Sequence, residues 1–112
     1  MYKMIRSTEL NRLPSGTVRF EGEPHGSGAS FFHVNNEPGK GSSLHMHPYP
    51  ETWIVRTGEV QFTVGGETIE AGTGDVVVAA ANLPHKYLNI GTEQLEMICI
   101  HPSPQIIQEA LE

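Results

Sequence analysis

The stretch from His45 to Glu51, HMHPYPE, places two histidines and a carboxylate within one short segment. If residues 42–47 form a strand, His45 and His47 project from the same face, with Cα atoms roughly 6–7 Å apart. The two prolines fix φ and donate no backbone hydrogen bond, so they end that strand and form a corner. Glu51 then begins the next strand, where its carboxylate can face the two histidines.

Two imidazoles and a carboxylate placed in this way suit a divalent transition metal with open coordination positions. A fourth candidate ligand, His85, lies in the segment NLPHKYLN. The two hairpins expected between Glu51 and His85 allow an antiparallel sheet to bring them together. The alternative is that each histidine is an ordinary surface or core residue with its own hydrogen bonds. The identity of the metal stays open among Fe, Mn, Zn, Ni and Cu.

The rest of the sequence predicts an all-β fold in a single domain, residues 1–112. Twelve glycines and eight prolines punctuate short segments, several of which alternate cleanly between apolar and polar residues. These segments are 17–22, 28–35, 42–47, 51–58, 59–66, 67–72, 75–81, 85–91 and 94–101. Strands about every ten residues with no helices between them indicate an antiparallel sandwich or barrel.

The C-terminal segment SPQIIQEALE, residues 103–112, has a different pattern. Ser103 and Pro104 are typical of a helix start. The apolar residues of the segment fall on one stripe at helical spacing: Ile106, Ile107, Ala110 and Leu111. This pattern predicts a short helix over about 104–111, packed on the barrel or on a partner subunit. Residues 1–13 are expected to add a strand or to form a tail that is ordered only in a dimer.

The spacing of the candidate ligands resembles that of the cupin family. The first cupin motif, G-x5-H-x-H-x3-E-x6-G, is matched at every fixed position, by Gly39, His45, His47, Glu51 and Gly58. The second motif, G-x5-P-x-G-x2-H-x3-N, is matched by Gly74, His85 and Asn89, whereas Ala80 replaces the proline and Asn82 the glycine. Asparagine is the next best residue to glycine at a left-handed turn position, so we expect the turn to survive.

The resemblance implies a jelly roll, or double-stranded β-helix barrel, with a conserved core over about 28–101. It also implies a metal ion held inside the barrel by three histidines and one glutamate. The positions of this chain that match those ligands are His45, His47, Glu51 and His85.

Several other residues are candidates for the wall of a substrate pocket. Trp53 and Val55 share the face of Glu51 if their strand is regular, which would give an apolar wall beside the metal. Tyr87 shares the face of His85 and is the candidate catalytic group, with simple packing as the alternative. Gln61 and Thr63 either line the cavity or form the wet face of their strand. His101 either reaches the cavity mouth or has a structural role.

The charge of the chain restricts its partners. The formal net charge is −6 and no cluster of Lys or Arg occurs, which argues against nucleic acid and anionic membranes. No apolar run approaches the ~20 residues that span a bilayer, and the start of the chain lacks the apolar region of a secretory signal. We therefore expect a cytoplasmic protein. Because a small barrel leaves sheet edges exposed, we also expect a homodimer.

Two functions fit these features. The first is a metal-dependent enzyme, a dioxygenase or an isomerase, that acts on a small oxygen-rich molecule. The second is a binding or sensing protein that holds a small sugar or acid on the metal without turnover. A storage role is disfavoured, because a storage protein does not need a complete set of metal ligands.

Overall fold

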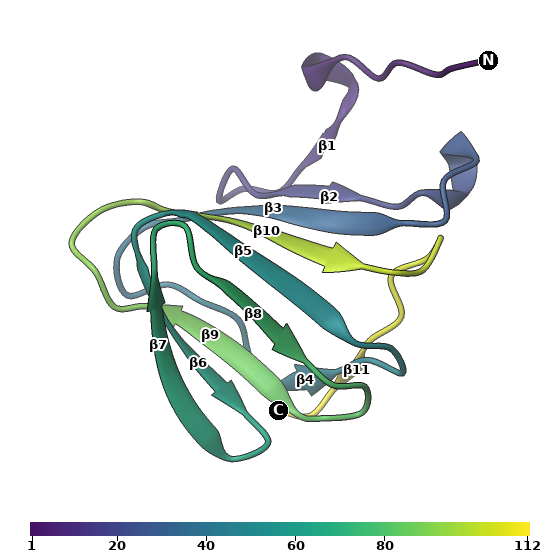
Figure 1. Cartoon of the computed structure of the whole chain (residues 1–112). Coiled ribbons are helices and arrows are strands. Elements are labelled where there is room, and N and C mark those ends of the chain that lie inside the picture. Colours follow the sequence, from purple (N-terminus) through teal and green to yellow (C-terminus); the bar gives the residue numbers. More distant parts are fainter.

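Two antiparallel β-sheets face each other in the structure, a computed structural model that describes residues 1–112 (Figure 1). The strands are β1 (Asn11–Arg12), β2 (Val18–Phe20), β3 (Ser30–Asn36), β4 (His45–Met46), β5 (Glu51–Thr57), β6 (Glu59–Val64), β7 (Glu67–Gly72), β8 (Val76–Ala79), β9 (His85–Asn89), β10 (Leu95–His101) and β11 (Glu109–Ala110). One sheet has the order β1-β2-β3-β10-β5-β8 and the other β11-β4-β9-β6-β7. The predicted all-β fold is confirmed.

Strict alternation along β5 and β10 builds the interior. In β10 every second residue, from Leu95 to His101, is buried, and in β5 the buried residues begin with Glu51 and Trp53. Trp53 stacks on Phe62 of the opposite sheet, with ring centroids 4.5 Å apart. The inward faces are therefore apolar along most of their length. At one end the same faces carry Glu51 and His101 in place of apolar side chains.

The turn before β9 forms as expected although it lacks the glycine of the cupin motif. Asn82 occupies that position with φ of 62°, in the left-handed region that asparagine tolerates. The backbone N–H of Asn82 donates to the carbonyl of His47 at 2.8 Å. The substitution therefore keeps the turn, and the turn holds the corner that carries His47.

The predicted C-terminal helix is not formed. Residues 104–108 run as an irregular chain, and Glu109–Ala110 form β11, which pairs with β4. The backbone groups that a helix would have used are bonded elsewhere: the Ile106 N–H donates to Glu21, and the Leu111 N–H donates to the Leu44 carbonyl. Long-range hydrogen bonds thus outweigh the helical periodicity of this segment.

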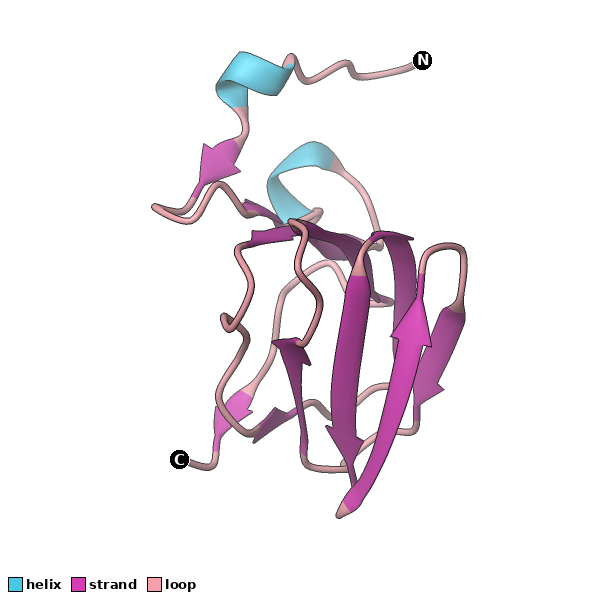
Figure 2. Cartoon of the chain, turned by 90° about the vertical axis from the view of Figure 1, so that its left-hand side faces the viewer, coloured by secondary structure: helices cyan, strands magenta, loops and turns pink.

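The first residues of the chain, which include a 3₁₀ turn at Ser7–Glu9, stand away from the two sheets, as Figure 2 shows. They lead into β1, whose two residues are exposed and which pairs with β2 at the edge of the larger sheet. A second 3₁₀ turn, Glu23–His25, follows β2. The structure has no helix with the length and apolar character needed to cross a membrane.

Candidate metal centre

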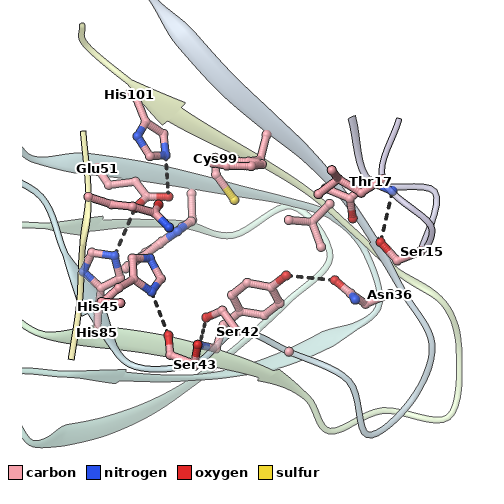
Figure 3. A pocket seen from close by; sticks show the side chains of 18 residues that line it. Ser15, Thr17, Asn36, Ser42, Ser43, His45, Glu51, His85, Cys99 and His101 are labelled. Atoms are coloured by element: carbon pink, nitrogen blue, oxygen red, sulfur yellow. Dashed lines mark hydrogen bonds and ion pairs between the residues drawn. The ribbon is translucent and has the colours of Figure 1, made fainter. Parts of the chain in front are cut away.

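Four side chains from separate parts of the chain meet between the sheets. They are His45 on β4, His47 at the corner after it, Glu51 at the start of β5 and His85 at the start of β9. One ligand atom from each lies within 4.8 Å of the others. Antiparallel pairing of β4 with β9 sets His45 opposite His85, and the close approach of these two side chains and Glu51 is visible in Figure 3.

Backbone carbonyls fix the orientation of all three imidazoles. The Nδ1 atoms of His45, His47 and His85 lie 2.7, 2.8 and 3.1 Å from carbonyl oxygens of Ser43, Ile107 and Leu83, respectively. A carbonyl oxygen only accepts, so each Nδ1 carries the proton and donates it. In the neutral rings Nε2 therefore keeps its lone pair, the form that ligates a metal.

The carboxylate of Glu51 faces two of these lone pairs. Its Oε1 atom lies 3.0 Å from His47 Nε2 and 3.1 Å from His85 Nε2. All three atoms are buried and none has a hydrogen-bond partner. Acceptors this close repel one another unless a positive charge sits among them, either a proton on a ring or a cation. The donor set therefore fits a divalent transition metal.

Two of the ligands have shifted pKa values. Burial alone would raise the pKa of Glu51, but the His101 ring beside the carboxylate holds it well below its ordinary value. Burial lowers the pKa of His45, and the neighbouring His85 and His47 lower it further. The carboxylate is therefore ionised and the His45 ring neutral over the range of pH in which transition metals bind imidazole.

A fourth histidine contacts the other carboxylate oxygen. His101 is 1% exposed, and its Nε2 atom lies 3.4 Å from Glu51 Oε2. The hydroxyl of Tyr49 accepts the Ile107 N–H at 3.1 Å and lies 2.6 Å from His101 Nδ1, and the carboxylate on the other side of the ring favours the tautomer in which Nδ1 accepts from this hydroxyl. That arrangement leaves the ring proton on Nε2, facing the carboxylate. His101 therefore lies beside the carboxylate and outside the ligand group.

The C-terminal tail closes one side of the site. The Ile107 carbonyl accepts from His47 and the Ile107 N–H donates to Tyr49. Farther along, the Leu44 N–H donates to the Glu112 carboxylate at 2.8 Å, next to the strand that carries His45. Sequence reasoning missed this contribution, because it assigned the tail to a helix and left Tyr49 without a role.

The family model described as a cupin domain matches residues 32–101. The chain belongs to the cupin family. Among solved structures, this cupin is similar to the formate complex of Lactobacillus farciminis oxalate decarboxylase, with 23% identity, a TM-score of 0.80 and coverage of 93% of this chain and 34% of that one. It is also similar to Bacillus subtilis oxalate decarboxylase with Mn(II) centres, with 24% identity, a TM-score of 0.77 and coverage of 85% and 27%.

These likenesses establish the fold of the cupin. The chain spans about a third or less of the length of those decarboxylases, since it covers 27% of one and 34% of the other. No curated protein matches the chain.

The metal-facing groups open onto a cavity of about 370 Å³ between the two sheets of the cupin. Three of the predicted wall residues line it, namely Trp53, Tyr87 and His101. The Trp53 ring meets the His85 ring edge-on, with centroids 5.1 Å apart. The site therefore combines a polar ligand group with an apolar wall, as ligand pockets commonly do.

The other three predicted wall residues do not line this cavity. Val55 is 1% exposed but lies farther along β5, within the apolar core. Gln61 and Thr63 lie on the outer face of β6, because Val60 and Phe62 occupy the inner face. Gln61 and Thr63 therefore form the solvent-facing side of their strand, the second of the two expected alternatives, since the alternation of β6 fixes two faces but does not say which one is inside.

Tyr87, the candidate catalytic group, is held by a hydrogen bond within the cavity. Its hydroxyl donates to Asn36 Oδ1 at 2.8 Å. Burial raises the pKa of Tyr87 well above its ordinary value. The phenol is therefore protonated at neutral pH, and its oxygen keeps lone pairs that can accept from a ligand.

Proposed function

We propose that this cupin is a metal-dependent enzyme of the dioxygenase or isomerase type that acts on a small oxygen-rich molecule. The observation that supports this most is the convergence of three Nε2 lone pairs and an ionised carboxylate beside a cavity of about 370 Å³. A set of four acceptors at the wall of a cavity leaves room for a substrate oxygen beside a bound cation.

The protein groups in this proposal have separate roles. His45, His47, Glu51 and His85 hold the ion, and His101 lies beside the carboxylate. When bound, a divalent transition metal supplies Lewis-acid polarisation of a substrate oxygen and, if it is redox-active, a means of activating O₂. Three neutral imidazoles and one carboxylate compensate one of its two charges, so the site retains an attraction for an anionic oxygen donor. The Mn(II) centres of the oxalate decarboxylase neighbour add support for a divalent metal.

A second function is non-catalytic binding of the same kind of molecule. It is favoured by the lack of a free acid–base pair in the cavity wall. Apart from the groups at the metal centre, the ionisable side chains that line it are Tyr87 and Cys99, and burial raises the pKa of both. Neither gives up its proton readily, so proton transfer would depend on groups at the metal centre.

Metal loading followed by turnover assays tests these functions. Metal-free protein is loaded with Fe(II), Mn(II) or Zn(II) and incubated with catechols, diketones, thiols, hydroxy ketones and oxalate, while O₂ uptake and product formation are followed. The enzyme proposal expects turnover that is lost in His85→Gln and kept in His33→Gln, which alters a histidine outside the site. Metal-dependent binding without turnover throughout the panel favours the second function. Equal metal affinity in wild type, His85→Gln and Glu51→Gln would overturn both.

A further inference from the structure

The cavity has two chemically different ends, which Figure 3 shows. One end carries the metal-facing group, where the labelled side chains of His45, His85 and Glu51 gather with His101. The opposite end is lined by small polar side chains without charge, namely Ser15, Thr17 and Asn36, whereas Ser42 lies between this end and the metal-facing group. Tyr87 lies between the two ends, because it follows His85 by two residues on β9 and reaches Asn36 with its hydroxyl.

The far end and the adjoining wall have unused hydrogen-bond donors. Asn36 accepts from Tyr87 through Oδ1, and its Nδ2 amide makes no hydrogen bond with the protein. The hydroxyl oxygens of Ser42 and Thr17 accept backbone N–H groups of Tyr87 and Asn35 at 3.2 and 3.0 Å. Each hydroxyl proton is therefore still available to donate. All three residues line the cavity, so a ligand that enters it can reach these groups.

The charges of the cavity limit what can occupy it. No Lys or Arg lines it, and Glu51 is its single carboxylate. With a divalent cation bound, the site therefore has an excess of about one positive charge, all at the metal end. A ligand with one negative charge at that end is compensated. A second negative charge at the far end would lose its water without gaining a counter-ion.

We infer that the substrate is a molecule with at most one negative charge that chelates the metal through two oxygens and carries a hydroxyl or amide at its other end. Asn36, assisted by Thr17, recognises that second group. This inference rests on the proposed metal site and specifies its substrate class. The inference excludes dicarboxylates as substrates, because the far end of the cavity has no counter-ion for a second carboxylate.

A series of hydroxamic acids tests the inference, because each member loses one proton on chelation and presents the same singly charged two-oxygen hydroxamate to the metal. The chains of five and six carbons end in a hydroxyl, an amide, a methyl or a carboxylate, and dissociation constants are measured by calorimetry on protein loaded with Mn(II) or Zn(II). We expect the hydroxyl and amide tails to bind at least tenfold more tightly than the methyl tail. We expect the carboxylate tail to bind at least tenfold more weakly than the amide of the same length.

The variant Asn36→Asp isolates the far end. It keeps the shape of the side chain and the acceptor for Tyr87, but it removes the amide donor and adds a negative charge. The advantage of the amide tail over the methyl tail should disappear, while the affinity of the methyl tail stays within about twofold. The matched control Gln61→Ala, on the outer face of β6, should leave all affinities unchanged. Circular dichroism and melting curves verify that both variants fold.

The possible failures can be told apart. Carboxylate tails that bind as tightly as amide tails, or an amide advantage that persists in Asn36→Asp, would overturn the inference while metal-dependent chelation stands. Hydroxamate binding that does not depend on the metal, or no binding by any member, would overturn the proposed metal site and the inference with it.

Discussion

His47 donates to the carbonyl oxygen of Ile107 at 2.8 Å, across 60 positions of the chain. The bond makes the C-terminal tail a part of the candidate metal centre, because it decides which nitrogen of His47 carries the proton. The tail thus acts on the ligand without touching the ion. Outer contacts of this kind often influence metal affinity strongly.

Removal of residues 106–112 should weaken metal binding by about 10–100-fold, the range typical for loss of an outer-sphere partner. His47 loses the carbonyl that fixes its tautomer, and Tyr49 loses the backbone N–H that positions its hydroxyl. Competition with a fluorescent chelator measures the affinity. Removal of residues 1–6, which lie outside the site, is the control. An unchanged affinity in the C-terminal truncation would show that the tail does not support the ligand group.

Glu51→Gln should leave the melting temperature of the metal-free protein nearly unchanged and should remove the stabilisation that metal gives to wild type. The amide can donate to an Nε2 lone pair, so the buried contacts of Oε1 with His47 and His85 lose their repulsion. The variant also loses the charge that His101 stabilises, so at pH 8 the metal-free variant should melt within a few degrees of wild type. Metal should raise the melting temperature of wild type and not of the variant. Calorimetric scans with and without Zn(II) measure this, with the exposed Glu67→Gln as control.

A marked loss of metal-free stability in Glu51→Gln would contradict the repulsion described for the site. It would mean that a ring proton already compensates the carboxylate at pH 8.

Metal occupancy should fall as the pH falls from 8 to 5, because protons compete for the imidazoles. The metal-free fold should weaken over the same interval. The lowered pKa of His45 means that protonation favours the unfolded chain below about 6.5, its ordinary value. The lowered pKa of Glu51 adds a loss below about 4.5. Urea denaturation and bound-metal analysis at each pH measure both effects, and constant occupancy from pH 8 to 5 would contradict the prediction.

Gly41→Ala should destabilise the protein by about 1–3 kcal/mol or more, the usual cost of overpacking. A Cβ atom at Gly41 would lie 2.0 Å from the Tyr87 carbonyl oxygen and 2.9 Å from the Leu88 Cα atom, both of them backbone. The segment before His45 would have to move away from β9. Gly28→Ala is the matched control, because its Cβ would meet nothing within 4 Å. Equal stability of the two variants in urea would contradict the close contact.

The homodimer stays a prediction, and the structure changes the surface that we expect it to use. A C-terminal helix is no longer available for the contact. The N-terminal arm, residues 1–10, is available for the contact, because Tyr2 is 90% exposed and Met4 is 58% exposed. Light scattering should give twice the chain mass of 12.3 kDa, and removal of residues 1–10 should give a monomer. A monomeric full-length chain would refute the prediction.

The candidate ligands could be predicted because their placement is largely local. Strand alternation puts His45 and His47 on one face, and the two prolines return the chain at Glu51. The spacing of the second motif added His85. The same alternation predicted the position of Trp53, which follows Glu51 by two residues on β5.

The remaining features depend on pairs that are distant in sequence. Tyr49 and His101 are 52 residues apart, and no local pattern indicates that their side chains meet. The tail has a convincing helical stripe, yet its backbone is bonded to β4 and to three side chains from elsewhere in the chain. Gln61 and Thr63 show that alternation defines two faces of a strand without saying which one is inside.

The involvement of the tail has a practical consequence for recombinant work. An affinity handle fused after Glu112 would pull on the strand beside His45, and a polyhistidine handle would bring competing imidazoles to the mouth of the site. The opposite terminus stands clear of both sheets (Figure 2) and suits a handle better. Metal contents measured on protein purified in the two ways are therefore not interchangeable.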